Sequence, residues 1–334
     1  MKSRLETLVQ AASRLETLLV MPHHNPDPDA LSSAAALCYV LNHQLKLAGQ
    51  IAYSGIIGRA ENKALVQYLN QPLTHVADLA SPPGQPVALV DTHPGAGNIM
   101  LPAGAAVILV IDHHLPLSGQ LTAPFVDIRP DVGATATILV EYLEVACIDP
   151  PGWLATALFY GIKTNTLGLG RNAGPADAAA YHFLQPKIDV EALANIEQAR
   201  VPPQYFKCFD LALRNARIYN GLIFSDLGVM DYPDQAAEIA DLLLRLERAR
   251  WVVCVGGHQQ ALIVSVRTRS RQDNAERLAI TLVHNLGAAG GHGTIAGGQI
   301  PLAGHNFNEL TAQLVQRALQ ALNISPDTPA DTLF

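Results

Sequence analysis

The chain has 334 residues, of which 49% are hydrophobic and 15% charged, and its formal net charge is −7. This length exceeds what one hydrophobic core usually organises, so two domains are expected. The acidic balance disfavours binding along long duplex nucleic acid, which depends on neutralising phosphates. The longest apolar runs, such as 105–111, are far shorter than the roughly 18–20 residues that span a bilayer, and the charged N-terminal segment is unlike a signal peptide. We therefore expect a cytoplasmic protein without a membrane partner.

The first half of the chain alternates between apolar runs and helical patterns. The runs that read as strands or extended segments are 17–21, 51–57, 87–90, 107–111 and 124–130. The segments that read as helices are 3–8, 30–48, 62–69, 133–145, 153–161, 175–184 and 189–200, and 82–84 reads as a loop. Continuous apolar strands separated by helices are typical of an α/β domain with a mostly parallel sheet and helices on both faces.

The second half has a similar alternation and predicts a smaller α/β domain. Its expected helices are 204–217, 234–248 and 274–286, and its expected strands are 222–225, 251–255 and 261–267. The glycine-rich stretch 290–298 reads as a flexible loop on one face of this domain. We therefore expect a first domain over 1–185, a helical connector over 186–216, a second domain over 217–334, and a cleft between the domains.

The stretch 23–29, His-His-Asn-Pro-Asp-Pro-Asp, lies where the first strand ends and a helix begins. Ligands of open α/β sheets bind at such carboxyl ends of strands. His23, Asp27 and Asp29 offer one nitrogen and two oxygen donors, a set that suits Mn, Fe, Zn or Mg better than a thiolate-binding ion. The alternative is an Asp-Pro turn in which Asp29 caps the helix. The stretch alone does not decide between the two.

Two later strands also end in acidic or histidine residues. The run 87–90 is followed by Asp91, and the run 107–111 by Asp112, His113 and His114. Each residue taken singly has a structural alternative as a helix cap or a buried histidine. Their joint position after strands favours convergence at one sheet edge. A carboxylate such as Asp91 can there bridge two ions about 3.5–4 Å apart, an arrangement suited to cleaving phosphoesters.

The spacing His23-x-x-x-Asp27-x-Asp29, then Asp91, then Asp112-His113-His114, resembles the DHH family of phosphoesterases. The stretch Gly290-Gly291-His292 followed by Ala296-Gly297 is similar to the glycine-histidine motif of that family's C-terminal domain. The family includes RecJ-type exonucleases, nano-RNA oligoribonucleases, pAp phosphatases, cyclic-dinucleotide phosphodiesterases and exopolyphosphatases.

The resemblance implies two Mn²⁺ ions, with Mg²⁺ or Co²⁺ as alternatives. The implied manganese ligands are His23, Asp27, Asp29, Asp91 and His113, with Asp91 bridging. His114 would face the scissile phosphate as a donor or general acid, and Asp112 would orient its histidine neighbours.

The stretch 161–166, Gly-Ile-Lys-Thr-Asn-Thr, departs from the family. Members usually carry Asp at the position of Asn165, where it ligates one of the two metals. Asn offers only a neutral carbonyl oxygen, so we expect weaker binding of that metal. A variant with altered metal preference, a non-catalytic member and an engineered substitution all remain open explanations.

Several residues are expected to bind substrate. Arg267 is expected to contact a substrate phosphate, whereas Arg269 and Arg271 are expected on a solvated strand edge. Gly290, Gly291 and His292 are expected to bring backbone donors close to an anion. Arg171, six residues after Asn165, is also expected to reach phosphate.

We expect a hydrolase of phosphodiester or phosphomonoester bonds whose partner is a short oligonucleotide, a dinucleotide or pAp. The sequence predicts neither a broad basic groove nor an aromatic stacking platform, which favours very short substrates. The alternatives are an exopolyphosphatase and a nucleotide-binding or regulatory protein that lost catalysis through Asn165. A homodimer is left open.

Overall fold

The computed structural model describes residues 1–69, 71–79, 84–115, 121–270 and 272–334, and structural statements below concern these ranges. The chain divides into two compact units, Met1–Ala199 (unit 1) and Arg200–Phe334 (unit 2). Most of the expected loop at 82–84, and Arg271, lie outside the described residues. No described helix has both the length and the apolar character needed to cross a membrane.

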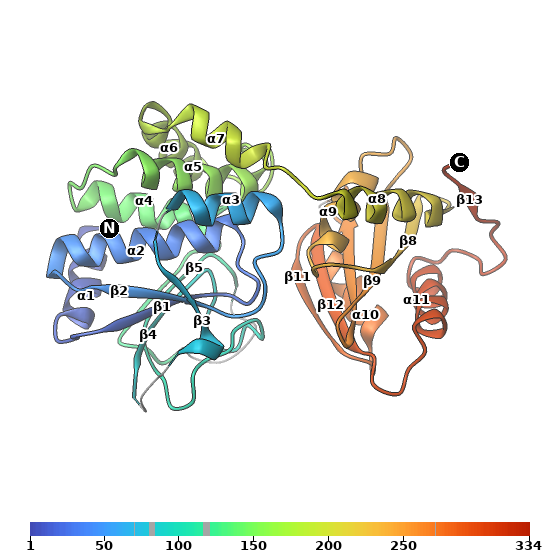
Figure 1. Ribbon diagram of the computed structural model, residues 1–334, viewed down its shortest axis with the longest axis horizontal. Coiled ribbons are helices and arrows are strands. Elements are labelled where there is room, and N and C mark those ends of the chain that lie inside the picture. Colours follow the sequence, from blue (N-terminus) through green and yellow to red (C-terminus); the bar gives the residue numbers. More distant parts are fainter. Residues whose placement is uncertain (70, 80–83, 116–120, 271) are drawn as a thin grey trace. The chain divides into compact units, whose positions relative to one another are not determined.

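Unit 1 is built on a six-stranded sheet in the order β3-β2-β1-β4-β5-β6 (Figure 1). Its strands are β1 (Leu18–Pro22), β2 (Gly49–Tyr53), β3 (Leu73–His75), β4 (Pro86–Val90), β5 (Ala106–Asp112) and β6 (Phe125–Ile128). All neighbouring strands are parallel. The predicted α/β class with a mostly parallel sheet is confirmed. The strand order changes direction between β1 and β4, the kind of position where α/β sheets bind ligands.

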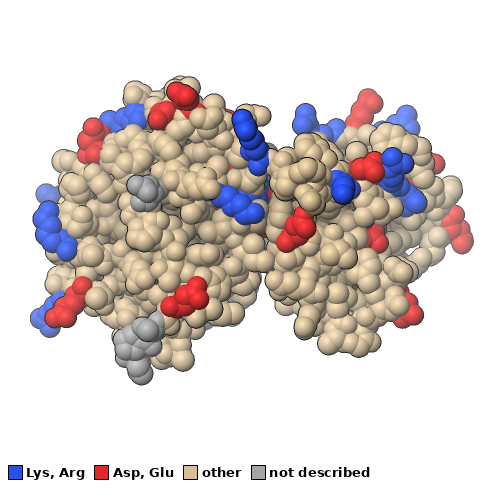
Figure 2. Space-filling view, in the orientation of Figure 1, with Lys and Arg blue, Asp and Glu red and all other residues tan. Residues whose placement is uncertain are grey.

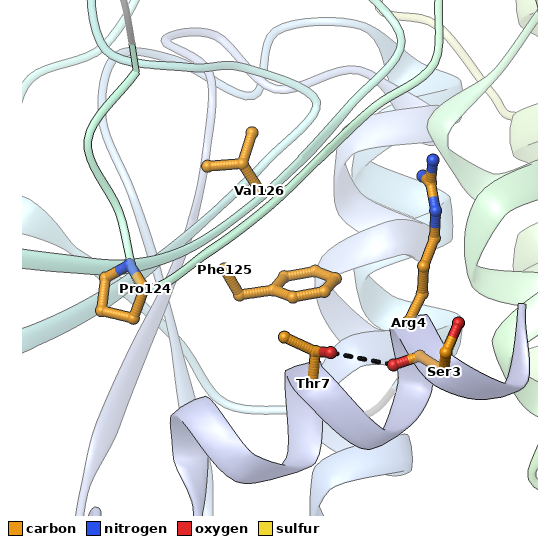
Figure 3. Close-up of a pocket in the computed structure, with 6 residues that line it drawn as sticks. All are labelled: Ser3, Arg4, Thr7, Pro124, Phe125 and Val126. Carbon is orange, nitrogen blue, oxygen red and sulfur yellow. Dashed lines mark hydrogen bonds between the residues drawn. The ribbon is translucent and has the colours of Figure 1, made fainter.

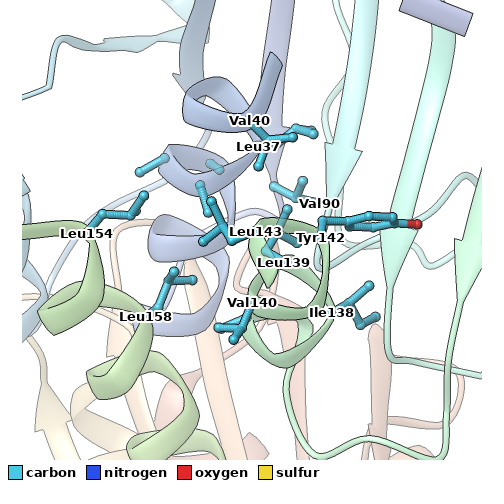
Figure 4. Packing of buried hydrophobic residues seen from close by; sticks show 14 of the residues in the cluster. Leu37, Val40, Val90, Ile138, Leu139, Val140, Tyr142, Leu143, Leu154 and Leu158 are labelled. Carbon is cyan, nitrogen blue, oxygen red and sulfur yellow. The ribbon is translucent and has the colours of Figure 1, made fainter. Parts of the chain in front are cut away.

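The helices of unit 1 pack mainly against one another and against one face of the sheet. They are α1 (Lys2–Ala12), α2 (Pro28–Leu45), α3 (Ala60–Leu69), α4 (Thr135–Val145), α5 (Gly152–Thr166), α6 (Pro175–Leu184) and α7 (Val190–Glu197), with short 3-10 helices η1 (Val76–Asp78) and η2 (Gln185–Lys187). Figure 4 shows the core between α2, α4 and α5, where Leu37, Leu139 and Leu158 are fully buried. Burying each such side chain stabilises the fold by about 1.5–3 kcal/mol. This core fixes the three helices relative to the sheet edge.

The second face of this sheet is covered differently from our expectation of helices on both faces. Its buried side chains, which include Leu19, Met21 and Leu89, pack against partly buried residues of connecting segments. Those residues include Leu79 and Ile99. Successive side chains of each strand point to opposite faces of the sheet, so an apolar strand makes both faces apolar. Helices cover chiefly one face, and connecting segments cover the other.

Gly161 of α5 allows this helix to approach the start of α2 closely. A Cβ atom at this position would lie 2.6 Å from Ser32 Oγ and 3.1 Å from Asp29 Cα. Residue 165 lies one turn further along the same face of α5. The close approach therefore brings Asn165 against Asp29.

We expect Gly161→Ala to lower the free energy of unfolding by about 1–3 kcal/mol, because the added methyl group overpacks the contact between α2 and α5. Urea denaturation followed by circular dichroism would measure this change. The matched control is Gly152→Ala in the same helix, where the added Cβ would meet only Lys187 O at an ordinary 3.6 Å. Equal stability of the two variants would contradict the packing argument.

Unit 2 contains a seven-stranded sheet in the order β11-β12-β10-β9-β8-β7-β13. Its strands are β7 (Arg217–Tyr219), β8 (Leu222–Val229), β9 (Trp251–His258), β10 (Ala261–Thr268), β11 (Ala288–His292), β12 (Ile295–Pro301) and β13 (Asp331–Thr332). Strands β8 and β9 are parallel, and the other neighbours are antiparallel.

Helices cover both faces of this second sheet. They are α8 (Pro203–Asn215), α9 (Gln235–Leu243), α10 (Ala275–Val283) and α11 (Phe307–Ala321). Successive residues of β9 face opposite cores: Val253 packs with α10 and α11, whereas Val252 packs with α8 and α9. The expected connector over 186–216 is divided between the units, because α7 contacts α3 and α5 whereas α8 contacts β8.

The glycine-rich stretch that we expected to be a flexible loop is a β-hairpin of β11 and β12. Gly290 pairs with Gly297 and Gly291 with Ala296 across the two strands. A Cβ at Gly291 would lie 2.4 Å from Ile295 O, so the lack of a side chain permits this close strand approach. Glycine is depleted in strands, which is why its density suggested a loop.

Candidate metal centre

The candidate site lies at the carboxyl edge of the unit 1 sheet, after the three adjacent strands β1, β4 and β5. The side chains of His23 and Asp27 come from the connection after β1, and Asp91 follows β4 directly. Asp112 is the last residue of β5, and His113 comes next. Because these parallel strands end at the same edge, residues distant in the sequence converge there. The convergence that the sequence predicted is present in the structure.

His23, Asp27 and Asp91 form the first group of potential metal ligands, with ligand atoms within 4.8 Å of one another. His23 Nε2 lies 3.8 Å from Asp27 Oδ1 and 3.5 Å from Asp91 Oδ2. His23 Nδ1 is 2.9 Å from the carbonyl oxygen of His24. A carbonyl oxygen only accepts, so Nδ1 carries a proton and Nε2 is the nitrogen that faces the two carboxylates. Burial lowers the pKa of His23, but the hydrogen bonds to Asp27 and Asp91 outweigh it and raise the pKa, so without a cation a proton lies between Nε2 and the carboxylates. This arrangement fits a shared cation.

Asp91, His113 and His114 form the second group. Asp91 Oδ1 lies 3.5 Å from His113 Nε2 and 3.7 Å from His114 Nδ1. His113 Nδ1 is 3.2 Å from the carbonyl oxygen of Val132, which again leaves Nε2 as the lone-pair nitrogen. The two oxygens of Asp91 thus face different imidazole groups, as a bridging carboxylate would.

The backbone at Asp91 is in the left-handed region, with φ of 59°. A residue other than glycine is uncommon there, although Asp and Asn tolerate the conformation better than most. Asp91 is only 1% exposed, and its Oδ1 accepts a hydrogen bond of 2.8 Å from the Thr135 hydroxyl. Such local strain, held by the surrounding structure, is typical of a functional position.

Asp29 is fully buried beside these groups, and protein donors surround its carboxylate. The backbone N–H groups of Thr135 and Ala136, in the first turn of α4, donate to its two oxygens at 2.8 and 2.7 Å. Burial, followed by the charges of Asp91 and Asp27, raises the pKa of Asp29 well above its usual value. The excess negative charge at this edge favours binding of a proton or a cation.

The residue that caps α2 is Asp27 rather than Asp29, which the alternative interpretation had assigned to this role. Asp27 Oδ1 accepts a hydrogen bond of 3.0 Å from the N–H of Ala30, and Pro28 occupies the first helical position. The same Oδ1 lies 3.8 Å from His23 Nε2, so the capping oxygen also faces the candidate site. One residue thus combines the structural and the ligand interpretations.

Asp112 orients three neighbouring groups and is fully buried. Its Oδ1 accepts hydrogen bonds from the backbone N–H of His113 at 2.7 Å and from His114 Nδ1 at 2.8 Å. Its Oδ2 is 2.6 Å from His93 Nδ1. Burial alone would raise the pKa of Asp112, but the hydrogen bonds from His114 and His93 outweigh it and lower the pKa. Asp112 therefore stays ionised.

His114 is held by Asp112 while part of its ring remains accessible, with a side-chain exposure of 33%. Burial lowers the pKa of His114, but the hydrogen bond that His114 donates to Asp112 and the charge of Asp91 outweigh it and raise the pKa to about 9. The protonated ring can therefore donate a proton at neutral pH. The role of proton donor that the resemblance implied for His114 stays a prediction.

The sequence analysis did not single out His93, which holds the second oxygen of Asp112. His93 is 2% exposed, and its Nε2 has no hydrogen-bond partner among the described residues. The available signal was its position two residues after Asp91, since residues two apart in an extended segment point to the same side. We interpret His93 as a positioning residue that acts through Asp112.

Asn165 and Arg171 also lie at this edge of unit 1. The Asn165 amide nitrogen is 2.9 Å from Asp29 Oδ2 and 3.4 Å from His113 Nε2. The Arg171 guanidinium donates a hydrogen bond to the backbone carbonyl oxygen of Asn165 at 3.3 Å. Its expected contact with a substrate phosphate stays a prediction.

The other expected substrate residues belong to unit 2. Arg267 is 6% exposed; its Nε donates to Asp241 at 2.6 Å, and its Nη1 donates to Ser265 Oγ at 3.1 Å. An anion that reaches Arg267 must compete with Asp241. Added Cβ atoms at Gly290 meet open space, whereas the side chain of His292 is outside what the structure describes. Anion binding by these residues stays a prediction.

A separate surface recess of about 330 Å³ lies between α1 and β6 (Figure 3). It is lined by Ser3, Arg4, Thr7, Pro124, Phe125 and Val126. The Thr7 hydroxyl donates to the Ser3 carbonyl oxygen at 2.9 Å, and Arg4 forms an ion pair with the buried Asp127. These polar groups serve the local packing of α1, so the chemistry of unit 1 remains at the sheet edge.

Residues 17–162 match the DHH family, N-terminal domain, a range that includes every potential metal ligand described above except Asn165. The chain therefore carries a DHH family domain, and its resemblance to the DHH phosphoesterases is confirmed.

Two curated proteins are similar to this chain in sequence. An uncharacterized protein of Methanocaldococcus jannaschii is 34% identical over 309 residues, covering 91% of this chain and 63% of that protein. A probable manganese-dependent inorganic pyrophosphatase of Enterococcus faecalis is 25% identical over 153 residues, covering 46% of this chain and 49% of that protein. The chain thus spans less than two thirds of the length of these curated relatives.

Solved structures share the fold. A crystal structure of an exopolyphosphatase-related protein from Bacteroides fragilis has a TM-score of 0.70 and 15% identity, with 96% of both chains covered. RecJ from Thermus thermophilus in complex with Mn²⁺ has a TM-score of 0.53 and 17% identity, covering 98% of this chain and 55% of that chain. These likenesses support the two-domain α/β arrangement.

Proposed function

We propose that this protein is a metal-dependent phosphoesterase that hydrolyses phosphodiester or phosphomonoester bonds in short nucleotides, such as dinucleotides, nano-RNA or pAp. The observation that carries the proposal is the position of Asp91, whose two oxygens face His23 on one side and His113 and His114 on the other. Carboxylate and imidazole ligands gathered around one carboxylate are suited to hold a cation against a phosphate.

The donor set supports manganese, with magnesium or cobalt as alternatives, because nitrogen and oxygen ligands occur without thiolates. The names of the pyrophosphatase relatives point to the same ion. A cation held at this edge by His23, Asp27 and Asp91 would stabilise negative charge on a phosphoryl oxygen and would lower the pKa of a bound water. The expected number of ions was two, one on each side of Asp91.

The protein's own groups perform the remaining tasks. His23 and Asp27 hold one side of the site, and their capped, hydrogen-bonded positions keep them in place without substrate. Protonated His114 donates its proton to the leaving oxygen of the phosphoester as the bond to phosphorus breaks. Asp112 keeps His114 oriented and charged until that transfer.

The surface and charge of the chain support short substrates. The net charge is −7, and on the face drawn in Figure 2 the Lys and Arg side chains stand scattered among Asp and Glu side chains. Long strands are bound through extended cationic surfaces. A short substrate needs few phosphate contacts beyond the metal centre.

A second candidate function is hydrolysis of phosphoanhydrides, as in an exopolyphosphatase. The full-length likeness to an exopolyphosphatase-related protein and the match to pyrophosphatases favour it. The same ligands would serve, because the reaction again transfers a phosphoryl group to water.

A manganese-dependent assay on linear dinucleotides, pAp, cyclic dinucleotides and polyphosphate tests these functions. We expect turnover of a dinucleotide or pAp that is lost with chelator, and a substantial increase with Asn165→Asp. Turnover of polyphosphate alone would replace the first candidate with the second. Binding of dinucleotide without hydrolysis, even by Asn165→Asp, would indicate a binding or regulatory protein and overturn the proposal.

A further inference from the structure

The side chain of Asn165 lies between two groups that otherwise direct lone pairs at each other. Its amide nitrogen is 2.9 Å from Asp29 Oδ2 and 3.4 Å from His113 Nε2. The close approach of α2 and α5 at Gly161 fixes this position. The amide therefore sits on the His113 side of Asp91, opposite the group that His23 and Asp27 form.

The neighbours determine which end of the amide faces inward. His113 Nδ1 donates to the Val132 carbonyl oxygen, so its Nε2 accepts. Asp29 Oδ2 accepts from the N–H of Thr135, so it too presents lone pairs. Only the side-chain NH₂ group of Asn165 can donate to both acceptors. In the flipped orientation the side-chain carbonyl oxygen would face two acceptors, with no proton to share. The amide protons thus provide the partial positive charge that a cation would otherwise supply.

We propose that the NH₂ group of Asn165 takes the place of a second cation, so that the resting protein holds one tightly bound divalent ion per chain, on His23, Asp27 and Asp91. The inference deepens the proposed function, since it concerns the same site and rests on its metal dependence. It replaces the sequence-based expectation of two manganese ions, one of them bound more weakly because of Asn165.

The charge of the site gives the physical reason. Asp27, Asp29 and Asp91 already place three carboxylates at the edge, and one cation held by Asp27 and Asp91 leaves mainly Asp29 to neutralise. Burial and the repulsion from Asp91 and Asp27 raise the pKa of Asp29, and one cation on these two residues would relieve that repulsion. The hydrogen bonds from Thr135, Ala136 and Asn165 would then stabilise the Asp29 carboxylate without a second ion. An aspartate at 165 would instead add a fourth carboxylate beside Asp29 and require a second cation.

Metal counting tests the proposal without substrate. We expect the wild-type chain, loaded with Mn²⁺ and dialysed, to retain one ion per chain by inductively coupled plasma mass spectrometry. Asn165→Asp is expected to retain two, and calorimetric titration should show a second site whose affinity exceeds that of wild type by on the order of 100-fold. The matched control is Asn308→Asp on the exposed start of α11, which makes the same charge change and should retain one ion.

Thermal unfolding provides an independent measurement. In chelator, Asn165→Asp should unfold at a lower temperature than wild type, and added Mn²⁺ should raise its Tm by more than it raises that of wild type. If the variant does not fold in chelator, the count for wild type still decides between one ion and two.

Two retained ions in wild type, or one in a folded Asn165→Asp, would overturn the inference. Failure of the proposed function has a different signature, namely one retained ion together with no hydrolysis of any substrate. In that case the structural role of Asn165 stands and the enzymatic assignment does not.

Discussion

Asp91→Asn should reduce metal-dependent hydrolysis by at least about 1000-fold. The two oxygens of Asp91 face His23 and His113. Replacing Asp91 with the neutral Asn should therefore weaken binding of the ion on the His23 side and leave the His113 side without a carboxylate. Asn also adopts the left-handed backbone that this position requires, with φ of 59°, so the fold is expected to persist.

Steady-state rates at saturating Mn²⁺, together with the number of retained ions, measure this effect. The matched control is Asp149→Asn in the same unit, because Asp149 has a side-chain exposure of 79% and pairs only with Lys187 in the described structure. This control should keep its full rate, since exposed pairs contribute little to stability. A rate for Asp91→Asn within tenfold of wild type would remove the basis for a metal centre at this edge.

Asp112→Asn should lower kcat by about 100-fold to 10,000-fold and move the basic limb of the pH–rate profile to lower pH. The pKa of His114 is raised to about 9, because the hydrogen bond that His114 donates to Asp112 and the charge of Asp91 outweigh the effect of burial. The protonated form is therefore present below that pKa and is lost as pH rises through it. Without the Asp112 charge the pKa falls, so the proton donor is lost earlier.

The pH profile of kcat separates this role from a purely structural one. A bound cation lowers the pKa of His114 in both proteins, so the difference between them is the diagnostic quantity. His114→Gln serves as the reference, because it has no titrating ring and should lose the basic limb altogether. If Asp112→Asn lowered kcat equally at every pH, Asp112 would only support the fold.

The sequence was sufficient to predict the parallel sheet and the place of the site. Each apolar run was long enough to identify a buried strand, and the polar residue after it had to lie at the sheet edge. This is why Asp91 and His113, distant in sequence from His23, were expected together. The residue types at those ends then indicated the class of chemistry.

Features that depend on contacts between distant segments were not predictable in the same way. The hydrogen bond of His93 to Asp112 depends on the register between β4 and β5, and no local sequence pattern encodes that register. The ion pair of Arg267 with Asp241 joins a strand to a helix across the sheet and buries a side chain that we expected to bind substrate.

Short or weakly patterned elements were also missed. β3 has three residues, and β7 and β13 are equally brief or briefer, too short to show an alternation. Helix α11 buries a narrow row of Leu310, Leu314, Ala318 and Leu319 between polar residues. Helix α5 continues to Thr166, beyond the predicted end at 161, and so places Asn165 on a rigid element rather than in a loop.

The two backbone N–H groups of α4 that donate hydrogen bonds to Asp29 can report on the state of the site. Amide nitrogen chemical shifts respond to whatever their acceptor binds, so the resonances of Thr135 and Ala136 should follow the state of the Asp29 carboxylate. A heteronuclear spectrum would then report binding of a cation at this sheet edge through two amide peaks, without added nucleotide and without a chromophore.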